Sequence, residues 1–331
     1  TGHPEWPDCK MYTKVGGKDL SANYLSYFQK TIEAVNDFAP NIIHVHHLMP
    51  LTWIARFVKI AYGLNFIVTV HGSELPTLEK DKRYPFLTSE ALHKAVRIIP
   101  NSFWTRDWMN RVLKDGFADQ IRVIPGGVDI NEFKKVDTED IDKKFDLRNK
   151  KVVVFAGKLT PYKGVKYLIY AAKKIKGEVL ILGDGSDRKN LEEIVNKEQI
   201  KNVRFLGHLG KDTKFLVKFY SRADVFVAPS VWDEPLGLVI LEAMACETPV
   251  VVTRKGGIPL AVKDGKNGLF IRSRNSNDIA EKVNYLLDNK EISVKMGKKA
   301  REIAVEKFSW KIIAQKFIDK YEKFATYPSN K

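Results

Sequence analysis

The feature that most constrains the fold of this chain is a regular alternation of short β-rich runs with helical segments, which occurs in two series. In the first series, strand-like runs at 41–46, 65–70, 95–100 and 121–125 alternate with helical patterns at 21–38, 50–62 and 102–114. In the second, strand-like runs at 151–157, 178–183, 203–207, 223–229, 249–253 and 268–271 alternate with helical patterns at 164–176, 187–197, 211–222 and 237–245, and two helices close the chain. Because strands separated by helices pair in parallel, we predict an α/β protein with two doubly wound, Rossmann-like parallel sheets.

A charged stretch at 134–144 separates the two series, and we interpret it as a linker. We therefore place a first domain at 1–135, a second at 136–306 and a closing helix at 307–331 that packs back on the first domain. Doubly wound domains usually open with a buried strand and a glycine-rich turn. Residues 1–20 contain no apolar strand, so we expect the first domain to lack its N-terminal strands.

Composition narrows the class of protein. No apolar run approaches the roughly 20 residues that cross a bilayer, and the first residues do not resemble a signal peptide. Cys9 and Cys246 are the only cysteines, which argues against a disulfide framework and favours the cytoplasm. The formal net charge of +15 lies mainly on helical lysines of the second half. We interpret them as a solvated face, with contact to the inner membrane face or another anionic surface as the open alternative.

The strongest local signal is the segment 229–245, in which a buried strand ends, a loop follows and a helix starts near Gly237. Glu234 lies on the loop, and Glu242 interrupts the apolar face of the helix two turns later. A helix start attracts phosphate through its unpaired N–H groups and its dipole. The two glutamates can accept hydrogen bonds from the hydroxyls of a polyol or ribose.

A second signal is the turn 157–164, which follows the first strand of the second series. Lys158 and Lys163 bracket this turn. Ligands of parallel sheets bind outside the carboxyl ends of the strands, and a pyrophosphate needs cations there. We predict that both lysines bind the ligand.

These motifs resemble those of the family 4 glycosyltransferases of the GT-B fold, which are retaining and depend on nucleotide sugars. The resemblance runs from Ile42-Ile43-His44-Val45-His46-His47 to Phe308-Ser309-Trp310 and is most specific between Gly157 and Phe270. It rests on the Glu-x7-Glu pattern and on Gly183-Asp184-Gly185, Phe205-Leu206-Gly207-His208, Gly256-Gly257-Ile258-Pro259 and Asp264-Gly265-Lys266-Asn267-Gly268. It implies two Rossmann-like domains that face a cleft.

The resemblance also assigns roles. Lys158 and Lys163, next to Gly157, match the pair that neutralises the donor pyrophosphate, and Glu242 matches the carboxylate that holds the ribose. Glu234 and His71 match residues that contact the transferred sugar, the latter across the cleft. The remaining matched positions are backbone groups beside the phosphate and sugar (Gly237, Leu238, Val239), the border of the base (Leu206, His208) and cleft-lining turns (Asn101-Ser102, Gly126-Gly127-Val128-Asp129).

The sequence departs from the family pattern in three respects. Lys158 stands where Arg is common, which keeps the charge but loses bidentate geometry. Gly126 stands where Asn is usual. The N-terminal glycine-rich loop that closes over the donor is not found, which hides the acceptor-binding residues.

Other patterns suggest chemistry that we do not favour. His44, His46 and His47 have no Asp or Cys cluster near them in sequence, so we expect packing or a cleft role rather than a metal site. Asp140-Ile141-Asp142 has the form of an Mn²⁺-binding Asp-x-Asp but lies in the charged linker, so we expect it to be solvated. Gly183-Asp184-Gly185 lacks the third glycine of a dinucleotide fingerprint. The aromatic residues of the second half are interpreted as core: Tyr162, Tyr167, Tyr170, Phe215, Phe219 and Tyr220.

Together these observations predict a retaining, metal-independent hexosyltransferase that uses a UDP- or GDP-sugar and no other cofactor. Glu234, His71 and Lys163 are the predicted catalytic residues, and the acceptor is a carbohydrate, a lipid or a small molecule. Three alternatives stay open: another reaction on the same fold, such as an epimerase or phosphorylase; a donor-binding fragment without an acceptor side; and a basic module for anionic surfaces or nucleic acid.

Overall fold

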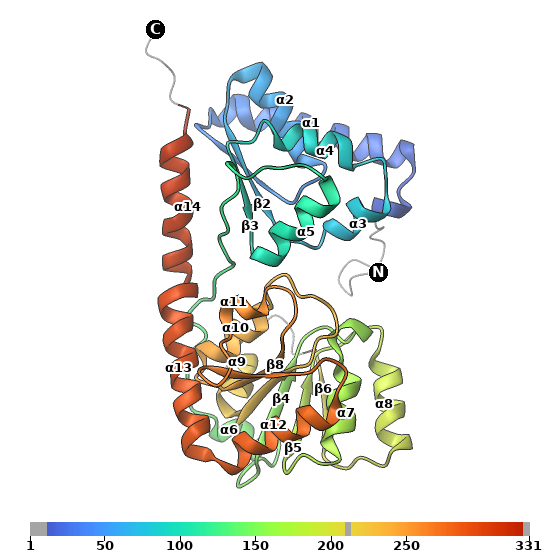
Figure 1. Cartoon of the computed structure of the whole chain (residues 1–331), viewed down its shortest axis with the longest axis vertical. Helices are drawn as coiled ribbons and strands as arrows, with labels where there is room; N and C mark the ends of the chain where they lie inside the picture. Colours follow the sequence, from blue (N-terminus) through green and yellow to red (C-terminus); the bar gives the residue numbers. More distant parts are fainter. Residues whose placement is uncertain (1–11, 209–212, 327–331) are drawn as a thin grey trace. The chain divides into compact units, whose positions relative to one another are not determined.

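The computed structural model of the chain describes residues 12–208 and 213–326 (Figure 1). The chain forms two compact units: unit 1 runs to Pro125 and resumes at Ala314, and unit 2 runs from Gly126 to Ile313. The division at Pro125 precedes the predicted domain boundary at 135. The sequence features at Cys9 and elsewhere in 1–11, at 211–212 and at 327–331 lie outside the described residues. No helix of the described residues is long and apolar enough to cross a membrane.

Unit 1 is built on a three-stranded parallel sheet in the order β1-β2-β3. Its strands are β1 (Ile43–His46), β2 (Phe66–Val70) and β3 (Arg97–Pro100). Its helices are η1 (Tyr12–Lys14), α1 (Gly17–Phe38), α2 (Leu51–Tyr62), α3 (Leu75–Lys80), α4 (Pro85–Leu92), α5 (Phe103–Leu113) and the part of α14 (Trp310–Phe324) that follows Ile313. All five residues of the central strand β2 are buried, as expected for a strand flanked on both sides.

The last turns of α14 are held to the edge of this sheet by specific contacts. The Tyr321 hydroxyl lies 2.7 Å from Nδ1 of His44, and Phe317 packs with its ring centroid 5.3 Å from that of His44. Beyond the helix, the N–H of Thr326 donates to the carbonyl of Asn41. The C-terminal helix therefore completes the packing around β1.

Unit 2 contains six parallel strands in the order β6-β5-β4-β7-β8-β9. The strands are β4 (Val152–Ala156), β5 (Glu178–Leu182), β6 (Val203–Gly207), β7 (Val225–Ala228), β8 (Val250–Thr253) and β9 (Gly268–Ile271). The helices are α6 (Glu139–Lys144), η2 (Pro161–Lys163), α7 (Val165–Ala172), α8 (Arg188–Lys197), α9 (Thr213–Arg222), α10 (Leu238–Ala245), α11 (Ile258–Ala261), α12 (Ser276–Asp288) and α13 (Lys290–Phe308).

The strand order of unit 2 reverses between β4 and β7. The chain builds β4, β5 and β6 in one direction and then returns to add β7, β8 and β9 on the other side of β4. Such a reversal leaves a crevice outside the carboxyl ends of the two strands, and ligands of open α/β sheets bind there. The crevice is bordered by the segments that follow Ala156 and Ala228.

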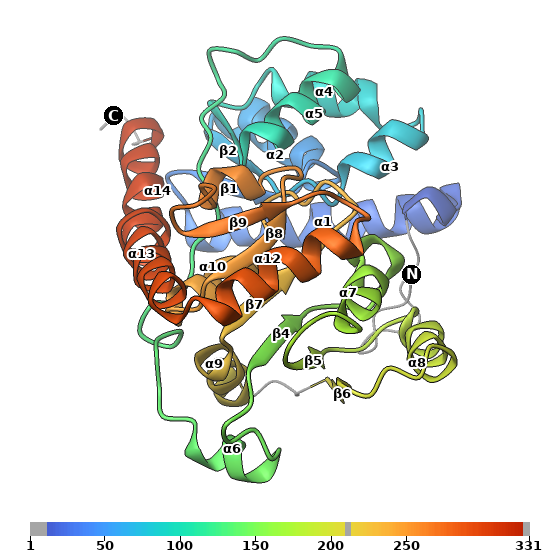
Figure 2. The same cartoon turned by 60° about the horizontal axis from the view of Figure 1, so that its bottom comes forward.

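Both faces of the six-stranded sheet are buried, because alternate strand residues point to opposite sides. Val152, Val154 and Phe226 pack with α9, α10 and α13 on one face. Val153 and Phe155 pack with α7, α8 and α12 on the other. Figure 2 shows α7 and α12 on one side of this sheet and α9 and α10 on the other.

Five local expectations from the sequence are wrong. Residues 121–125 form no strand: Ile121 makes one isolated bridge to Ile98, because Pro100 has no N–H to extend the pairing. The linker 134–144 contains helix α6, anchored by the fully buried Ile141. Its Asp142 is not solvated but ion-paired with Arg222.

The other two concern the C-terminal region and the aromatic residues. Three helices, α12, α13 and α14, follow the last strand instead of two. Tyr162 and Tyr170 are exposed by 62% and 38%, so they do not belong to the core, whereas Phe219 and Tyr220 are fully buried as expected.

Candidate functional site

The crevice of unit 2 is shaped by glycines whose backbones touch neighbouring loops. Gly164 ends the turn after β4 with a φ of +67°, and a Cβ there would lie 2.1 Å from the carbonyl oxygen of Pro229 after β7. A Cβ on Gly183, after β5, would lie 2.0 Å from the carbonyl of Gly157. Only glycine permits such approaches at positive φ. The turns at the carboxyl ends of β4, β5 and β7 are thus packed directly against one another.

Lys163 and Glu234 meet in this crevice. The Nζ of Lys163 lies 2.6 Å from Oε1 of Glu234, and the hydroxyl of Ser230 donates to the same oxygen at 2.8 Å. Glu234 is only 8% exposed, while the Lys163 side chain is 30% exposed. A buried carboxylate persists when it is paired and hydrogen-bonded in this way. The ammonium has three donors, so two remain for a ligand.

Glu242 lies on α10 and is half-buried, and its carboxylate is hydrogen-bonded by a residue of α9. The hydroxyl of the fully buried Tyr220 donates to Oε2 of Glu242 at 2.9 Å. Burial raises the pKa of Glu242, the bond from Tyr220 lowers it, and the nearby charge of Glu132 raises it. Because Tyr220 occupies Oε2, Oε1 remains the acceptor available to a hydroxyl.

Helix α10 begins beside these carboxylates. Gly237 precedes it with a φ of +81°. The amides of Leu238 and Val239 belong to the first turn, whose N–H groups have no partner inside a helix. Leu238 is 49% exposed. This arrangement supplies two backbone donors and the positive end of a helix dipole.

The remaining predicted donor residues lie at the same edge of the sheet. Gly157 follows β4 directly, and its N–H donates to the carbonyl of Leu182. Lys158 is exposed and makes no ion pair with the described residues of unit 2. Leu206 lies in β6, partly buried against the core, and His208 is exposed just after that strand. In unit 2, the predicted donor-binding residues thus lie at or near the carboxyl ends of β4, β6 and β7 and in the first turns of α10.

The predicted residue His71 lies in unit 1, immediately after β2. Nε2 of His71 is 3.0 Å from Nδ1 of His46, and its backbone N–H donates to Oε1 of Glu74 at 3.2 Å. His47 Nδ1 lies 3.3 Å from Oε2 of Glu74, and this contact raises the pKa of His47. Among the described residues, no group of three or more His, Cys, Asp or Glu side chains could hold a metal ion.

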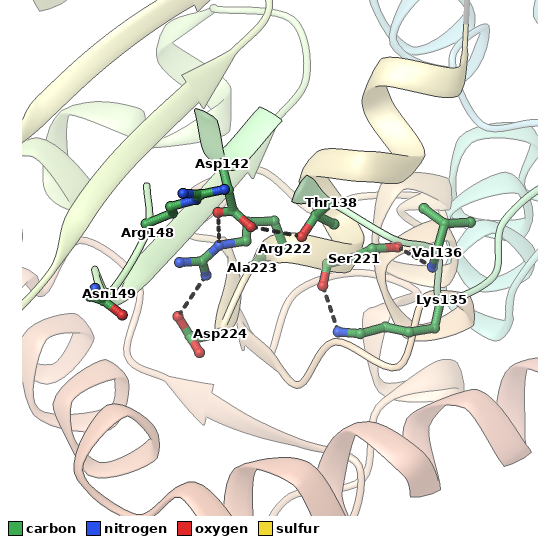
Figure 3. Close-up of a pocket in the computed structure, with 10 residues that line it drawn as sticks. All are labelled: Lys135, Val136, Thr138, Asp142, Arg148, Asn149, Ser221, Arg222, Ala223 and Asp224. Atoms are coloured by element: carbon green, nitrogen blue, oxygen red, sulfur yellow. Dashed lines mark hydrogen bonds and ion pairs between the residues drawn. The ribbon is translucent and has the colours of Figure 1, made fainter. Parts of the chain in front are cut away.

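A separate hollow of about 490 Å³ opens at the opposite edge of the unit 2 sheet, before β4 and β7 (Figure 3). Several of its polar side chains already have partners: Arg222 pairs with Asp142 and Asp224, and Lys135 donates to the carbonyl of Ser221. We interpret this network as the attachment of the 135–150 segment to the sheet. The buried thiol of Cys246 is also inert, because burial raises its pKa to about 12.

Sequence reasoning missed three residues that hold the predicted ones in place. Ser230 belongs to the same segment as Glu234 and directly follows the predicted strand 223–229. That position could have marked it as a site residue. Tyr220 was assigned to the core alone, and its bond to Glu242 spans 22 positions. Glu74 lies three residues after His71, a spacing typical of side-chain to backbone bonds at a turn.

Comparison with known proteins places both units in described families. Residues 137–303 match the family Glycosyl transferases group 1, and residues 12–132 match Glycosyltransferase Family 4. An uncharacterized glycosyltransferase of Methanocaldococcus jannaschii is 31% identical over 270 residues, which are 82% of this chain and 72% of the relative. The alpha-maltose-1-phosphate synthase of Mycolicibacterium smegmatis is 30% identical over 318 residues, which are 87% of this chain and 80% of the relative.

Solved structures support the same fold. The Anabaena protein HepE, crystallised with UDP, superposes with a TM-score of 0.81 at 21% identity, covering 89% of this chain and 82% of that protein. The sucrose-phosphate synthase of Thermosynechococcus elongatus superposes with a TM-score of 0.80 at 24% identity, covering 96% and 82%. At these identities the likeness establishes the GT-B-like α/β architecture and no more.

Proposed function

We propose that this chain, which belongs to the glycosyl transferases of group 1, moves a hexose from a UDP- or GDP-sugar to an acceptor hydroxyl with retention at the anomeric carbon. Membership of the family establishes sugar transfer from a nucleotide-sugar donor as the coarse activity. The observation that carries the finer proposal is the 2.6 Å pair of Lys163 and Glu234 in the crevice between β4 and β7, beside the start of α10. That pair sets a cation beside a carboxylate that we propose binds the sugar.

Each part of the donor finds a matching group in unit 2. We assign the diphosphate to Lys163, Lys158 and the amides of Leu238 and Val239, because cations and a helix start both stabilise phosphate charge. We assign the ribose diol to the free oxygen of Glu242. Leu206 and His208 are assigned to the border of the base.

The transferred sugar is assigned to Glu234 and His71. The bond from the anomeric carbon to the phosphate oxygen breaks as the acceptor oxygen bonds to the same face of that carbon. The electron pair stays on the departing phosphate, which takes the acceptor proton. Lysines and backbone N–H groups fixed around the phosphate stabilise this developing charge, and such donors typically contribute about 3 kcal/mol each. Neither glutamate is given the role of a nucleophile, because both are proposed to bind hydroxyls.

Structures of one neighbour support a uridine nucleotide as part of the donor. UDP is bound in the Anabaena structure and UDP-glucose in a further structure of the same protein, which covers 89% of this chain. We propose a diphosphate of uridine or guanosine as the leaving group. Since the lysines compensate the phosphate charge, we propose that no divalent metal is required, and turnover should be unchanged in excess EDTA.

Release of free nucleoside diphosphate from a panel of UDP-, GDP- and ADP-sugars tests the proposal. We expect slow hydrolysis of one hexose donor without acceptor and faster release when a hydroxyl acceptor is supplied. The anomeric configuration of the product, read by NMR, should equal that of the donor. Binding of a nucleotide sugar with neither hydrolysis nor transfer to any acceptor would favour a donor-binding chain without an acceptor side, and an inverted product would contradict the proposed mechanism.

A further inference from the structure

Four histidines of unit 1 lie together at the carboxyl ends of β1 and β2. His44 and His46 are on the same face of β1, His47 follows that strand and His71 follows β2. The ring centroids are 4.3 Å apart for His44 and His46, 5.2 Å for His46 and His71, and 4.6 Å for His47 and His71. Of the four, only His71 has a proposed role, and the structure gives it a direct ring-to-ring partner.

The contact between His46 and His71 has a strict chemical requirement. Nδ1 of His46 lies 3.0 Å from Nε2 of His71, so one nitrogen must carry a proton and the other a lone pair. If His46 donates, a neutral His71 carries its own proton on Nδ1; if His46 accepts, Nδ1 of His71 is left as a lone pair. Nδ1 of His71 has no hydrogen-bond partner among the described residues of unit 1.

We propose that His46 is a positioning residue for His71: its bond to Nε2 holds the ring plane of His71 and couples the tautomers of the two rings, so that the state of Nδ1, which donates to or accepts from a hydroxyl of the transferred sugar, is set together with that of His46. This inference rests on the proposed contact of His71 with that sugar. The hydrogen bond made by one ring nitrogen generally sets the state of the other.

Among the groups around His71, His46 is the one that we propose controls the orientation of its ring. The backbone of His71 is fixed on both sides, by its N–H bond to Glu74 and by the Asn101 side-chain amide, which donates to its carbonyl at 3.0 Å. The buried carboxylate of Glu74 also holds His47. His44 is occupied by Tyr321 and Thr69. Among the described residues of unit 1, the hydrogen bond to the ring of His71 therefore comes from His46, while His47 packs against the same ring.

The titratable groups that face this pair keep it neutral. Burial lowers the pKa of His71, and the charges of His47 and His46 lower it further, while Glu74 raises it. Burial and the charge of His47 lower the pKa of His46. His44 is also kept neutral, with a pKa of about 4. The hydrogen bond is therefore formed above pH 6.5 and is lost only when both rings are protonated, below that value.

Two variants of nearly equal shape test the inference. The side-chain amide of His46→Asn occupies the place of Nδ1 and can donate or accept, whereas His46→Leu can do neither. Nitrogen-15 NMR of the ring of His71 in the full chain, above pH 6.5, reports its tautomer without any substrate. We expect the ratio of the two His71 tautomers in the wild type to differ from the ratio in His46→Leu, where Nε2 has lost this partner, and we expect Nε2 to stay hydrogen-bonded in His46→Asn. An unchanged tautomer ratio in His46→Leu would overturn the inference.

Turnover provides the second arm. We expect His46→Leu to lower kcat for the nucleotide sugar on the order of tenfold, as for the loss of one hydrogen bond at a functional group, and His46→Asn to recover most of it. The Kd of the free nucleoside diphosphate should not change, because its proposed ligands are in unit 2. Equal losses in both variants would overturn the inference. Absence of turnover in the wild type would instead reject the proposed function, while the NMR comparison would still decide the role of His46.

Discussion

Each unit carries its candidate site residues near the carboxyl ends of its own parallel strands, but the two units hold different kinds of side chain there. Unit 2 holds charged groups there: Lys163 is paired with Glu234, and the exposed Lys158, in the turn after β4, makes no ion pair with the described residues of this unit. Unit 1 gathers imidazoles, of which His44, His46 and His71 are kept neutral by burial and by their neighbours. A charged site suits a diphosphate, and a neutral site with ring nitrogens suits hydroxyl groups.

The two sites are also built differently. In unit 2 the loops are held by backbone contacts that only glycine allows, as between Gly164 and Pro229. In unit 1 the histidines are held by side-chain bonds, as between His71 and Glu74. We therefore infer that unit 2 has a rigid site for the proposed nucleoside diphosphate. In unit 1, the arrangement of the histidine rings depends instead on side-chain hydrogen bonds.

The largest effect is expected from Lys163→Ala. It removes the cation proposed to face the diphosphate and leaves the buried Glu234 with Ser230 as its partner. We expect donor hydrolysis to fall about 10²- to 10³-fold, the usual loss for one charge-stabilising donor. The exposed Lys166, which contacts only the ring of Tyr167, is the matched control, and Lys166→Ala should be active. Normal donor hydrolysis by Lys163→Ala would show that Lys163 does not stabilise the charge of the diphosphate in unit 2.

Gly164→Ala tests whether backbone contact shapes the crevice. The residue has a φ of +67°, and the new Cβ would collide with the Pro229 carbonyl. Gly63 in unit 1 has a φ of +70° but no atom within 4 Å of such a Cβ. Gly63→Ala should therefore cost about 1 kcal/mol of unfolding free energy from the left-handed conformation alone. Gly164→Ala should cost clearly more in denaturant unfolding; equal costs would show that the close approach does not matter.

Glu242→Gln separates binding from stability in unit 2. The raised pKa of Glu242 means that its stabilising contribution is present below pH 4.5 and is lost as the pH rises through the folded-state value. The neutral variant keeps an acceptor for Tyr220, so at pH 7 its Tm should exceed that of the wild type. Its Kd for the nucleoside diphosphate should rise on the order of tenfold, because an acceptor of the ribose diol is weakened. A lower Tm at pH 7 would contradict the assigned cost of the buried charge.

The smallest expected effect is on the pH dependence of stability at His44 of unit 1. This dependence runs opposite to that of Glu242. The pKa of His44 is lowered to about 4 by burial, then by His46 and His71, so its contribution to stability is present above pH 6.5 and is lost as the pH falls toward 4. His44→Gln should flatten the stability profile in that window by on the order of 1 kcal/mol, after allowance for solvent screening. Urea unfolding at pH 7 and pH 5 measures it, and an unchanged slope between the two would refute the assignment.

Much of this architecture could be predicted from the sequence, because periodicity and turn residues are local. The predicted helix 187–197 lies at Arg188–Lys197, and the strands after Gly177 and Asn202 were recognised from β-branched and apolar runs. The run at 121–125 has the same composition, yet it forms no strand. Its failure depends on Pro100, which stands far away in sequence.

Local motifs predict individual residues of the candidate site but not the partners that the fold brings to them. Glu234, Glu242 and Lys163 could be chosen because each stands next to a strand end or a helix start. Their partners could not, since Tyr220 and Glu242 are brought together by the packing of α9 on α10. The pairing of His46 with His71 likewise requires the register of β1 and β2, which places His46 beside Thr69.

Isothermal titration of UDP and GDP into the wild type and into Lys163→Ala, in the presence of EDTA, tests the central claim most directly. We expect one of the two nucleotides to bind the wild type without metal, and we expect Lys163→Ala to lose most of this affinity while Lys166→Ala keeps it. Absence of binding by either nucleotide, or equal affinity in the wild type and Lys163→Ala, would contradict the assignment of the donor diphosphate to the crevice between β4 and β7.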